Sequence, residues 1–383
     1  MPAKSLSINI NEILIISISL FYAGISSSII FGFRVIDFLI PLIALSLLRK
    51  RVSATFILLS FLWLTSVGVS FIIGVYNNNP FVMSDTRFFL ILIISAYVGY
   101  ELGRSHEIDF YKVYYLLLLA TVIIYTLIPL FDGLRFYYIP EEFQKDEHAN
   151  TVFGPSTILI NYLFVYLALI NRKQPASFYF FYLLFAIFIY NLRISRTDFA
   201  LMILFFIWAL LYRFGEKVKT KHVLAAAVII LVGAVLLYFN QSERIEGIFN
   251  PGQDSSFVYR ILSNNEFLRQ FGETSLVSKL FGFGMGATLV TYFNDWFGEV
   301  TFTILDNGPL TFLMKTGWFG LVVFTLILGF ALKGIKIRTA LILLLPILLS
   351  LALFSHIIYN LLYILGFYMV CFKLRLSKGK EIK

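Results

Sequence analysis

Cysteine, histidine and charge are all scarce in this sequence. Of its 383 residues, one is cysteine, four are histidine, and 14% are charged. A single thiol, Cys371, excludes a disulfide framework and a multi-cysteine metal site, and the histidines lack the spacing of a zinc-binding motif. Internal repeats and low-complexity segments are absent from the sequence as well. We therefore expect a chain that works without a metal ion or cofactor.

Apolar residues, in contrast, are abundant, at 59% of the chain. A soluble protein of this length cannot hide so much apolar surface, because its exterior still needs polar groups. Lipid is therefore the expected solvent, and membrane lipid an expected partner. The net charge of +9 then indicates the basic cytoplasmic loops of a membrane protein rather than a surface for nucleic acid.

The apolar runs predict an all-α, polytopic bundle of transmembrane helices. A span needs roughly 20 apolar residues to cross about 30 Å of hydrocarbon, which gives about 12 spans, or 11 to 13, in one membrane domain over residues 1–383. The predicted spans are 12–31, 34–48, 54–75, 86–103, 112–131, 151–170, 177–193, 198–212, 223–239, 306–332, 339–355 and 357–372.

The placement of Lys and Arg predicts the orientation of these spans. With the N-terminus in the cytoplasm, every short basic cluster falls on the cytoplasmic side, as the positive-inside rule requires, and the C-terminus is cytoplasmic too. Two long connections then lie outside: an outer loop at 132–150, and a large extracytoplasmic loop at 240–305 with short amphipathic helices. Long loops of this kind are usually functional.

The outer side is enriched in arginine, while lysine dominates inside. Arginine offers a planar fork that binds phosphate oxygens with two bonds and stays charged when partly buried. An outer phosphate or carboxylate ligand would explain the enrichment, and so would salt bridges to outer acids such as Asp85, Glu243 and Asp254. The outer arginines are Arg34, Arg87, Arg135, Arg193, Arg196, Arg244, Arg260 and Arg269.

Two features of the large loop suggest local structure. Its apolar residues are spaced for a short helix lying along the membrane surface; they are Phe257, Ile261, Leu262, Phe267, Leu268 and Phe271. The stretch FGFGMG at 281–286 only loosely resembles a dinucleotide-binding motif, and no strand–helix–strand unit surrounds it. We interpret it as a turn that returns the chain to the membrane.

Polar residues also lie at the outer ends of two spans. Arg193, Arg196 and Asp198 lie at the outer junction of the spans at 177–193 and 198–212. Charges in such positions are costly and are candidates for function, although Arg196 and Asp198 could also form a structural pair. Asp306 and Asn307 open the span at 306–332, where either residue could simply cap the helix.

In this order, the pieces resemble the superfamily of O-antigen polymerases and O-antigen ligases, which transfer lipid-linked glycans. The resemblance covers about residues 190–330, with weaker similarity at 33–42 in FRVIDFLIPL. Its motifs are Ser195–Arg196 opening a span, Arg260 in the large loop, the turn at Leu280–Gly286, and a short polar motif followed by Thr316–Leu321.

The resemblance implies a glycosyltransferase of the bacterial inner membrane with a periplasmic active site. It would transfer a growing glycan from undecaprenyl pyrophosphate to a new lipid-linked repeat unit, with chain-length regulator and flippase proteins as partners. Preorganised arginines would stabilise the leaving pyrophosphate, which implies Arg196 and Arg260, backed by Arg193 and Arg244. The implied general base is Asp306, with His148 and Glu142 as alternatives.

The two branches of the superfamily, polymerases and ligases, are distinguished at one point of this sequence. Ligases carry a His-Asn pair where this chain has Asp306 and Asn307, so the resemblance favours the polymerase branch over ligation to lipid A-core. A flippase or transporter for lipid-linked sugars is an alternative of another class. Such a protein would show repeated halves or helices broken near the midplane, and the sequence shows neither.

Overall fold

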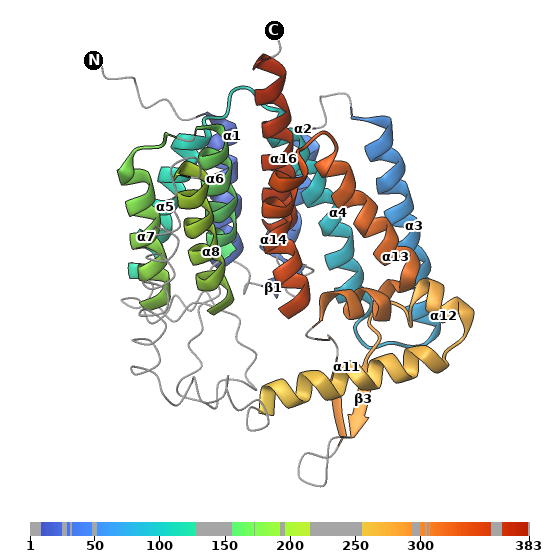
Figure 1. Cartoon of the computed structure of the whole chain (residues 1–383). Helices are drawn as coiled ribbons and strands as arrows, with labels where there is room; N and C mark the ends of the chain where they lie inside the picture. The colour runs from blue at the N-terminus through green and yellow to red at the C-terminus, as the bar shows by residue number, and fades with distance from the viewer. Residues whose placement is uncertain are drawn as a thin grey trace.

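In the computed structural model, the chain folds into a bundle of helices with two short hairpins (Figure 1). The residues described are 9–24, 29–30, 33–47, 52–127, 155–171, 173–191, 196–214, 255–292, 299–302, 305, 307–353 and 362–381. The predicted all-helical class is therefore confirmed for this part of the chain.

A helix occupies each predicted span that falls within the described residues, and the span at 223–239 lies outside them. The helices that match predicted spans are α1 (Ile10–Gly24), α2 (Val35–Leu47), α3 (Ala54–Tyr76), α4 (Val82–Arg104), α5 (Phe110–Leu127), α6 (Pro155–Ile170), α7 (Ala176–Asn191), α8 (Arg196–Phe214), α13 (Gly308–Leu332), α14 (Ile337–Leu353) and α16 (Leu362–Glu381).

Four elements come from the region predicted as the large loop. Helices α11 (Ser255–Glu273) and α12 (Leu276–Phe281) are followed by the antiparallel hairpin of β3 (Leu289–Tyr292) and β4 (Glu299–Phe302). A second hairpin, β1 (Ile29–Ile30) with β2 (Phe33–Arg34), joins α1 to α2. Helix α11 lies across one end of the bundle, nearly perpendicular to the other helices (Figure 1).

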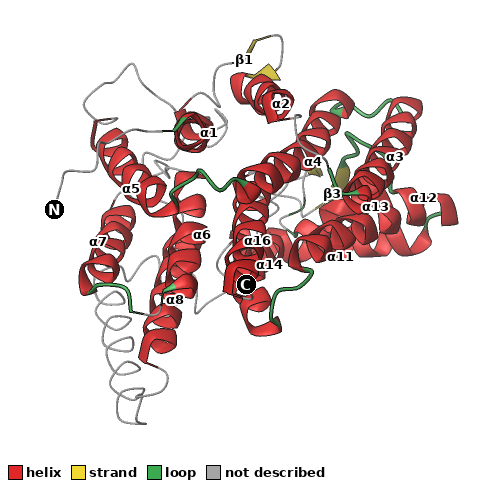
Figure 2. Ribbon diagram, turned by 90° about the horizontal axis from the view of Figure 1, so that it is seen from above, coloured by secondary structure: helices red, strands yellow, loops and turns green. Residues whose placement is uncertain are grey.

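Helix α16 is central in the bundle and packs on both α4 and α6 (Figure 2). The approach to α4 depends on Gly99 and Gly103, four residues apart on one helix face. A Cβ atom at either glycine would lie 2.4 Å from a carbonyl oxygen of α16, that of Leu365 or Met369. Small residues at this spacing let membrane helices touch through their backbones.

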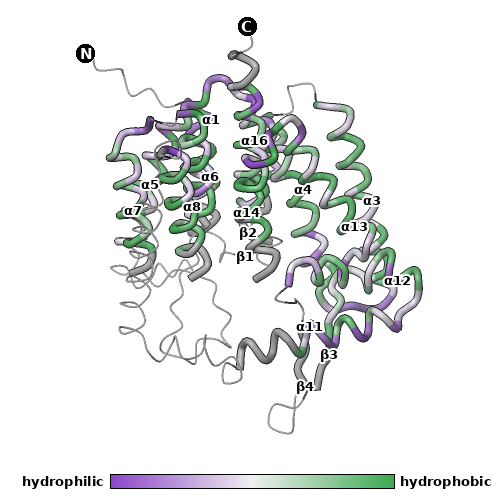
Figure 3. The backbone as a smooth tube through the Cα atoms, in the orientation of Figure 1, coloured by the Kyte–Doolittle hydropathy of each residue, from purple (hydrophilic) through white to green (hydrophobic). Residues whose placement is uncertain are grey.

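Within the part of the chain that the structure describes, three helices are long and apolar enough to cross a membrane, namely α3, α4 and α13. Much of the apolar surface of α3, and part of that of α13, faces outward. Figure 3 shows that α3 is largely hydrophobic along its length. Phe61 is 65% exposed on α3, and Val322 is 52% exposed on α13. Soluble monomers rarely expose extended apolar faces, so this surface indicates a membrane protein. The other apolar helices of the described residues are shorter.

Candidate functional site

The stretch at 281–286 forms a turn built on three glycines, as predicted, although the chain then continues into β3 rather than directly into a membrane span. Gly282, Gly284 and Gly286 have φ angles of +79°, +93° and +73°, a region that other residues rarely adopt. Each glycine also touches a different segment of the bundle. An added Cβ would come within 3 Å of the backbone of Lys315, Gly74 and Val82, respectively.

Backbone hydrogen bonds fix this glycine turn (residues 281–286) between α3 and α13. The amide of Met285 donates to the carbonyl of Ser70 at 2.9 Å, and the amide of Phe283 donates to the carbonyl of Met314 at 2.8 Å. The side-chain amide of Asn79 donates to the carbonyls of Phe283 and Met285, at 3.2 and 2.9 Å. The turn is thus held by residues that are distant in the sequence.

An ion pair between Asp85 and Lys315 lies directly beside the turn. The Lys315 ammonium is 2.7 Å from Oδ2 of Asp85, and the two side chains are 0% and 7% exposed. Lys315 also donates to the carbonyl of Ala287, and Oδ2 of Asp85 accepts from the amide of Gly286 at 2.9 Å. Two charges and the backbone that follows the turn therefore form one buried network.

Helix α13 is broken next to Lys315. Gly317 has φ +63° and ψ −166°, so two helical segments meet there. An added Cβ at Gly317 would lie 2.4 Å from the backbone of Leu280, which means that the break is where α12 crosses α13. Asn307 caps the first segment, because its side-chain oxygen accepts from the amide of Leu310 at 3.2 Å. The predicted capping role of Asn307 is confirmed.

Helix α11 turns two aromatic residues of its second half toward the protein. Phe267 and Phe271 are 0% and 7% exposed and pack against Phe283 of the glycine turn. This helix was expected to lie along the membrane surface with its apolar residues; of the four whose side chains are described, Phe267 and Phe271 are buried and Leu262 and Leu268 are exposed, at 40% and 50%. Phe267 and Phe271 belong to a small hydrophobic core of their own, which also holds Ala287, Leu289 and Leu305.

The described charges of α11 are paired within the helix. The Arg269 guanidinium donates two bonds to the carboxylate of Glu266, at 2.7 and 3.0 Å, and also contacts Glu273. These bonds lower the pKa of Glu266 to about 2, because they favour the ionised carboxylate. For Arg269, the salt-bridge interpretation of the outer arginines therefore holds.

Two of the predicted site arginines lie in described helices. Arg196 is the first residue of α8, and Arg260 lies in the first half of α11. Helix α8 begins at the end of the bundle that α11 crosses (Figure 1). The side chains of both arginines lie outside what the structure describes, as do residues Arg193, Arg244, Asp306, His148 and Glu142.

The sequence indicated Asp85 only as a possible salt-bridge partner of the outer arginines. Lys315, its partner in the structure, was not among the predicted site residues. Lys315 stands alone in an otherwise apolar stretch, LTFLMKTGWFGL. An ionisable residue inside a membrane span is by default a candidate for function, so this signal was present in the sequence. Among the described residues, no cluster of three or more His, Cys, Asp or Glu side chains could hold a metal ion.

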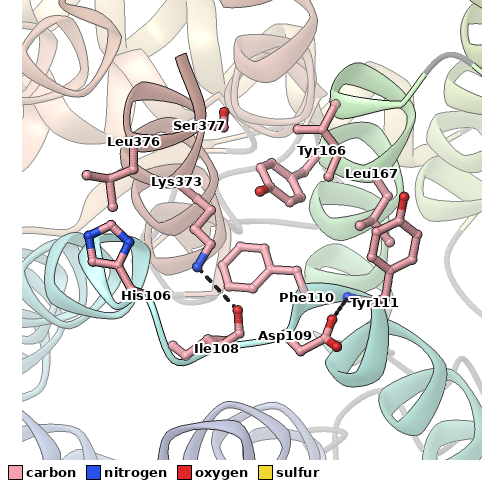
Figure 4. Close-up of a pocket in the computed structure, with 11 residues that line it drawn as sticks. His106, Ile108, Asp109, Phe110, Tyr111, Tyr166, Leu167, Lys373, Leu376 and Ser377 are labelled. Carbon is pink, nitrogen blue, oxygen red and sulfur yellow. Dashed lines mark hydrogen bonds between the residues drawn. The ribbon is translucent and has the colours of Figure 1, made fainter. Parts of the chain in front are cut away.

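A cavity of about 340 Å³ lies at the opposite end of the helices (Figure 4). Lys373 of α16 forms part of its wall and donates to the carbonyls of Ser105 and Ile108, at 2.6 and 3.2 Å. Asp109 accepts from the amide of Tyr111 at 2.9 Å. These contacts join the connection between α4 and α5 to the end of α16, so the polar groups of this cavity serve the fold.

Comparison with known proteins identifies no relative of this chain. Neither family models, nor curated proteins, nor solved structures give a match to this chain.

Proposed function

We propose that this chain is a multi-pass protein of the bacterial inner membrane with both termini in the cytoplasm. Successive helices of the bundle alternate in direction, and α1 begins at the end where α16 finishes (Figure 1). Basic residues gather at that end: Arg104 and Lys112 lie in the helix turns on either side of the connection after α4, Lys173 follows α6, Lys333 and Lys336 follow α13, and further basic residues lie in the last turns of α16. The positive-inside rule assigns this end to the cytoplasm. The glycine turn and α11 are then periplasmic.

We further propose that the protein is a polymerase of O-antigen or a related surface polysaccharide. One observation carries this proposal: the two motif stretches of the resemblance, Leu280–Gly286 and Thr316–Leu321, pack against each other. Gly282 and Leu280 touch the backbone at Lys315 and Gly317. Motifs that are distant in the sequence thus form one unit, at the end of the bundle where α8 begins with Arg196.

In the proposed reaction, a hydroxyl of the new lipid-linked repeat unit attacks the anomeric carbon of the growing glycan. The bond from that carbon to undecaprenyl pyrophosphate breaks, and the pyrophosphate leaves with the electron pair. Arg196 and Arg260, supported by Arg193 and Arg244, neutralise the developing charge. Asp306 accepts the proton of the attacking hydroxyl, a role worth about 10²–10⁴-fold in rate. His148 and Glu142 are the alternative bases.

The buried network supports this function by fixing geometry. Asp85 and Lys315 neutralise each other and bond to backbone atoms at Gly286 and Ala287. They therefore anchor the large loop, with α11 and Arg260, to α4 and α13. A transferase that positions two lipid-linked substrates needs such a rigid support, because misplacement of about 1 Å can reduce a rate 10²-fold.

The test is a deletion strain analysed by its surface polysaccharide. A polymerase deletion loses the ladder of long chains and keeps bands that carry a single repeat unit. If long lipid-linked chains accumulate without attachment, the protein is a ligase. If lipid-linked repeat units remain on the cytoplasmic face, it is a flippase. An unchanged ladder rules out all three functions, and expression of the intact chain must restore the original profile.

A further inference from the structure

Helix α12 exposes three of its four apolar residues and half-buries its polar ones. Leu276, Val277 and Leu280 are 72%, 61% and 43% exposed. Ser278 and Lys279, between them, are only partly exposed. A helix in water orients itself the other way, with its apolar side inward. The exposed face of α12 therefore fits an apolar medium.

The orientation of α12 is fixed by contacts at both ends. Ser275 caps its first turn by accepting from the amide of Ser278. At its last residue, the ring of Phe281 packs on Phe319 of α13 at 5.8 Å between centroids. The carbonyl of Phe281 accepts from the hydroxyl of Ser70 on α3 at 3.1 Å. Because these contacts prevent rotation, Leu276, Val277 and Leu280 cannot turn inward.

The apolar surface continues from α12 onto the two helices that hold it. Helix α12 packs against α13 and α3 (Figure 1), both of which are long and apolar enough to cross a membrane. Near this end, α3 exposes Ile72 and Val75, and α13 exposes Trp318 at 49%. Tryptophan is enriched where a helix meets the membrane–water boundary. The apolar surface of α12 is thus continuous with surface that faces lipid.

We propose that α12 is embedded in the outer boundary of the bilayer, with Leu276, Val277 and Leu280 in contact with acyl chains. Short apolar segments held in the interface are a known mode of membrane contact. Lys279 in the last turn of α12 can place its ammonium among the headgroups while its stem stays in the apolar layer. This inference rests on the membrane placement of α3 and α13, and it does not depend on the enzymatic activity.

The proposal sets the depth of the candidate site. Gly282 directly follows α12, and the glycine turn carries the chain to the network of Asp85 and Lys315. If α12 lies among acyl chains, this network, which lies beside the turn that follows α12, is close to the outer boundary of the bilayer. Helix α11, whose aromatic face is buried against the protein, then lies on the water side of α12.

Spin labelling tests this placement, and the chain suits it because its single cysteine, Cys371, is buried. In a Cys371→Ala background, single cysteines replace Leu276, Val277 or Leu280. Phe61, 65% exposed on α3, is the lipid reference. Gly272, exposed on α11 with open space around its Cβ, is the water reference. Labelled protein is reconstituted in phosphatidylethanolamine–phosphatidylglycerol vesicles, and relaxation by oxygen is compared with relaxation by a water-soluble nickel chelate.

Labels on α12 are expected to be relaxed more by oxygen than by nickel, like the label at 61 but nearer the membrane surface. The label at 272 should show the reverse. Dominant nickel relaxation at 276, 277 and 280, with an oxygen-dominated label at 61, overturns the proposal. Immobile labels that neither reagent reaches overturn it too, because a second copy or a partner protein then covers α12. If nickel relaxes the label at 61 more than oxygen does, α3 does not face lipid there, and the membrane placement on which this proposal rests is wrong.

Discussion

The ammonium of Lys315 lies 2.7 Å from Oδ2 of Asp85, and Lys315 is fully buried. Asp85 lies in the first turn of α4, and Lys315 precedes the break in α13. Each charge therefore offsets part of the other's desolvation penalty at the contact between two helices. The same carboxylate oxygen holds the amide of Gly286, so the pair links the loop to the bundle as well.

Loss of one partner of this pair should be strongly destabilising. Lys315→Met leaves the Asp85 carboxylate buried without its partner, and we expect a loss of about 3–5 kcal/mol in stability. Asp85→Asn should also destabilise the protein, although its side-chain oxygen can still accept from Gly286. Thermal unfolding of purified protein in detergent measures both effects.

The double variant Asp85→Asn with Lys315→Met is the control for coupling. Because it removes both charges together, it should be more stable than the Lys315→Met variant and less destabilised than the sum of the single changes, by about 0.5–3 kcal/mol. Additive losses would mean that the two side chains act independently, in conflict with the observed pair.

The glycine turn should not tolerate a side chain at Gly286. Its φ is +73°, and a Cβ there would lie 2.3 Å from the amide nitrogen of Val82. We expect Gly286→Ala to lower the yield of folded protein and its unfolding temperature. Gly272→Ala is the matched control, because Gly272 is helical with nothing within 4 Å of an added Cβ. Alanine there should be neutral or stabilising by up to about 1 kcal/mol. If the two variants give the same yield and the same unfolding temperature, the turn does not fit tightly around Gly286.

Arginine at positions 196 and 260 should not be replaceable by lysine. If these residues bind pyrophosphate through two parallel bonds, Arg196→Lys and Arg260→Lys should each lower polymerisation by about tenfold or more. Transfer between purified lipid-linked repeat units measures the rate. Arg269→Lys is the control on the same helix as Arg260, because Arg269 is 58% exposed and pairs with Glu266 and Glu273. Full activity of both test variants would exclude bidentate binding.

Arg375, at the end of the bundle opposite the glycine turn, should contribute to stability. Its Nη2 donates to the carbonyls of Phe330 and Ala331, at 2.7 and 2.6 Å, and so satisfies the last turn of α13. Arg375→Met should cost about 1.5–3 kcal/mol, the range for bonds from a charged donor. Arg338, exposed on α14, is the control, and Arg338→Met should leave the unfolding temperature nearly unchanged.

The positions of the helices were largely predictable, because apolar runs of sufficient length have few other solutions in lipid. The run at 54–75 became α3, Ala54–Tyr76. The end of the last helix was not predictable in this way. Helix α16 continues to Glu381, beyond the predicted limit at 372. Hydropathy cannot detect this extension, because it is rich in charged residues and is supported by contacts such as those of Lys373 and Arg375.

The candidate site was predictable only in parts. FGFGMG indicated a turn, since glycines allow positive φ, but the sequence could not show what the turn touches. Lys315 was a visible signal, as the lone charge of its stretch. Its pairing with Asp85 depends on the contact of distant helices, which no local pattern reports. The period of apolar residues in α11 correctly indicated a helix, yet it could not distinguish a face buried on protein from one laid on lipid.

The pairing of Asp85 with Lys315 has a consequence for biosynthesis. In the proposed topology, helices α3 and α4 enter the membrane long before α13 is translated, so the Asp85 carboxylate at first lies at a helix interface without its counter-ion. A nascent chain that ends before α13 thus exposes an unpaired charge where lipid or another helix should pack. Such a fragment is a natural target for membrane proteases. A gene split between α8 and α11 should therefore yield stable product only when both halves are synthesised together.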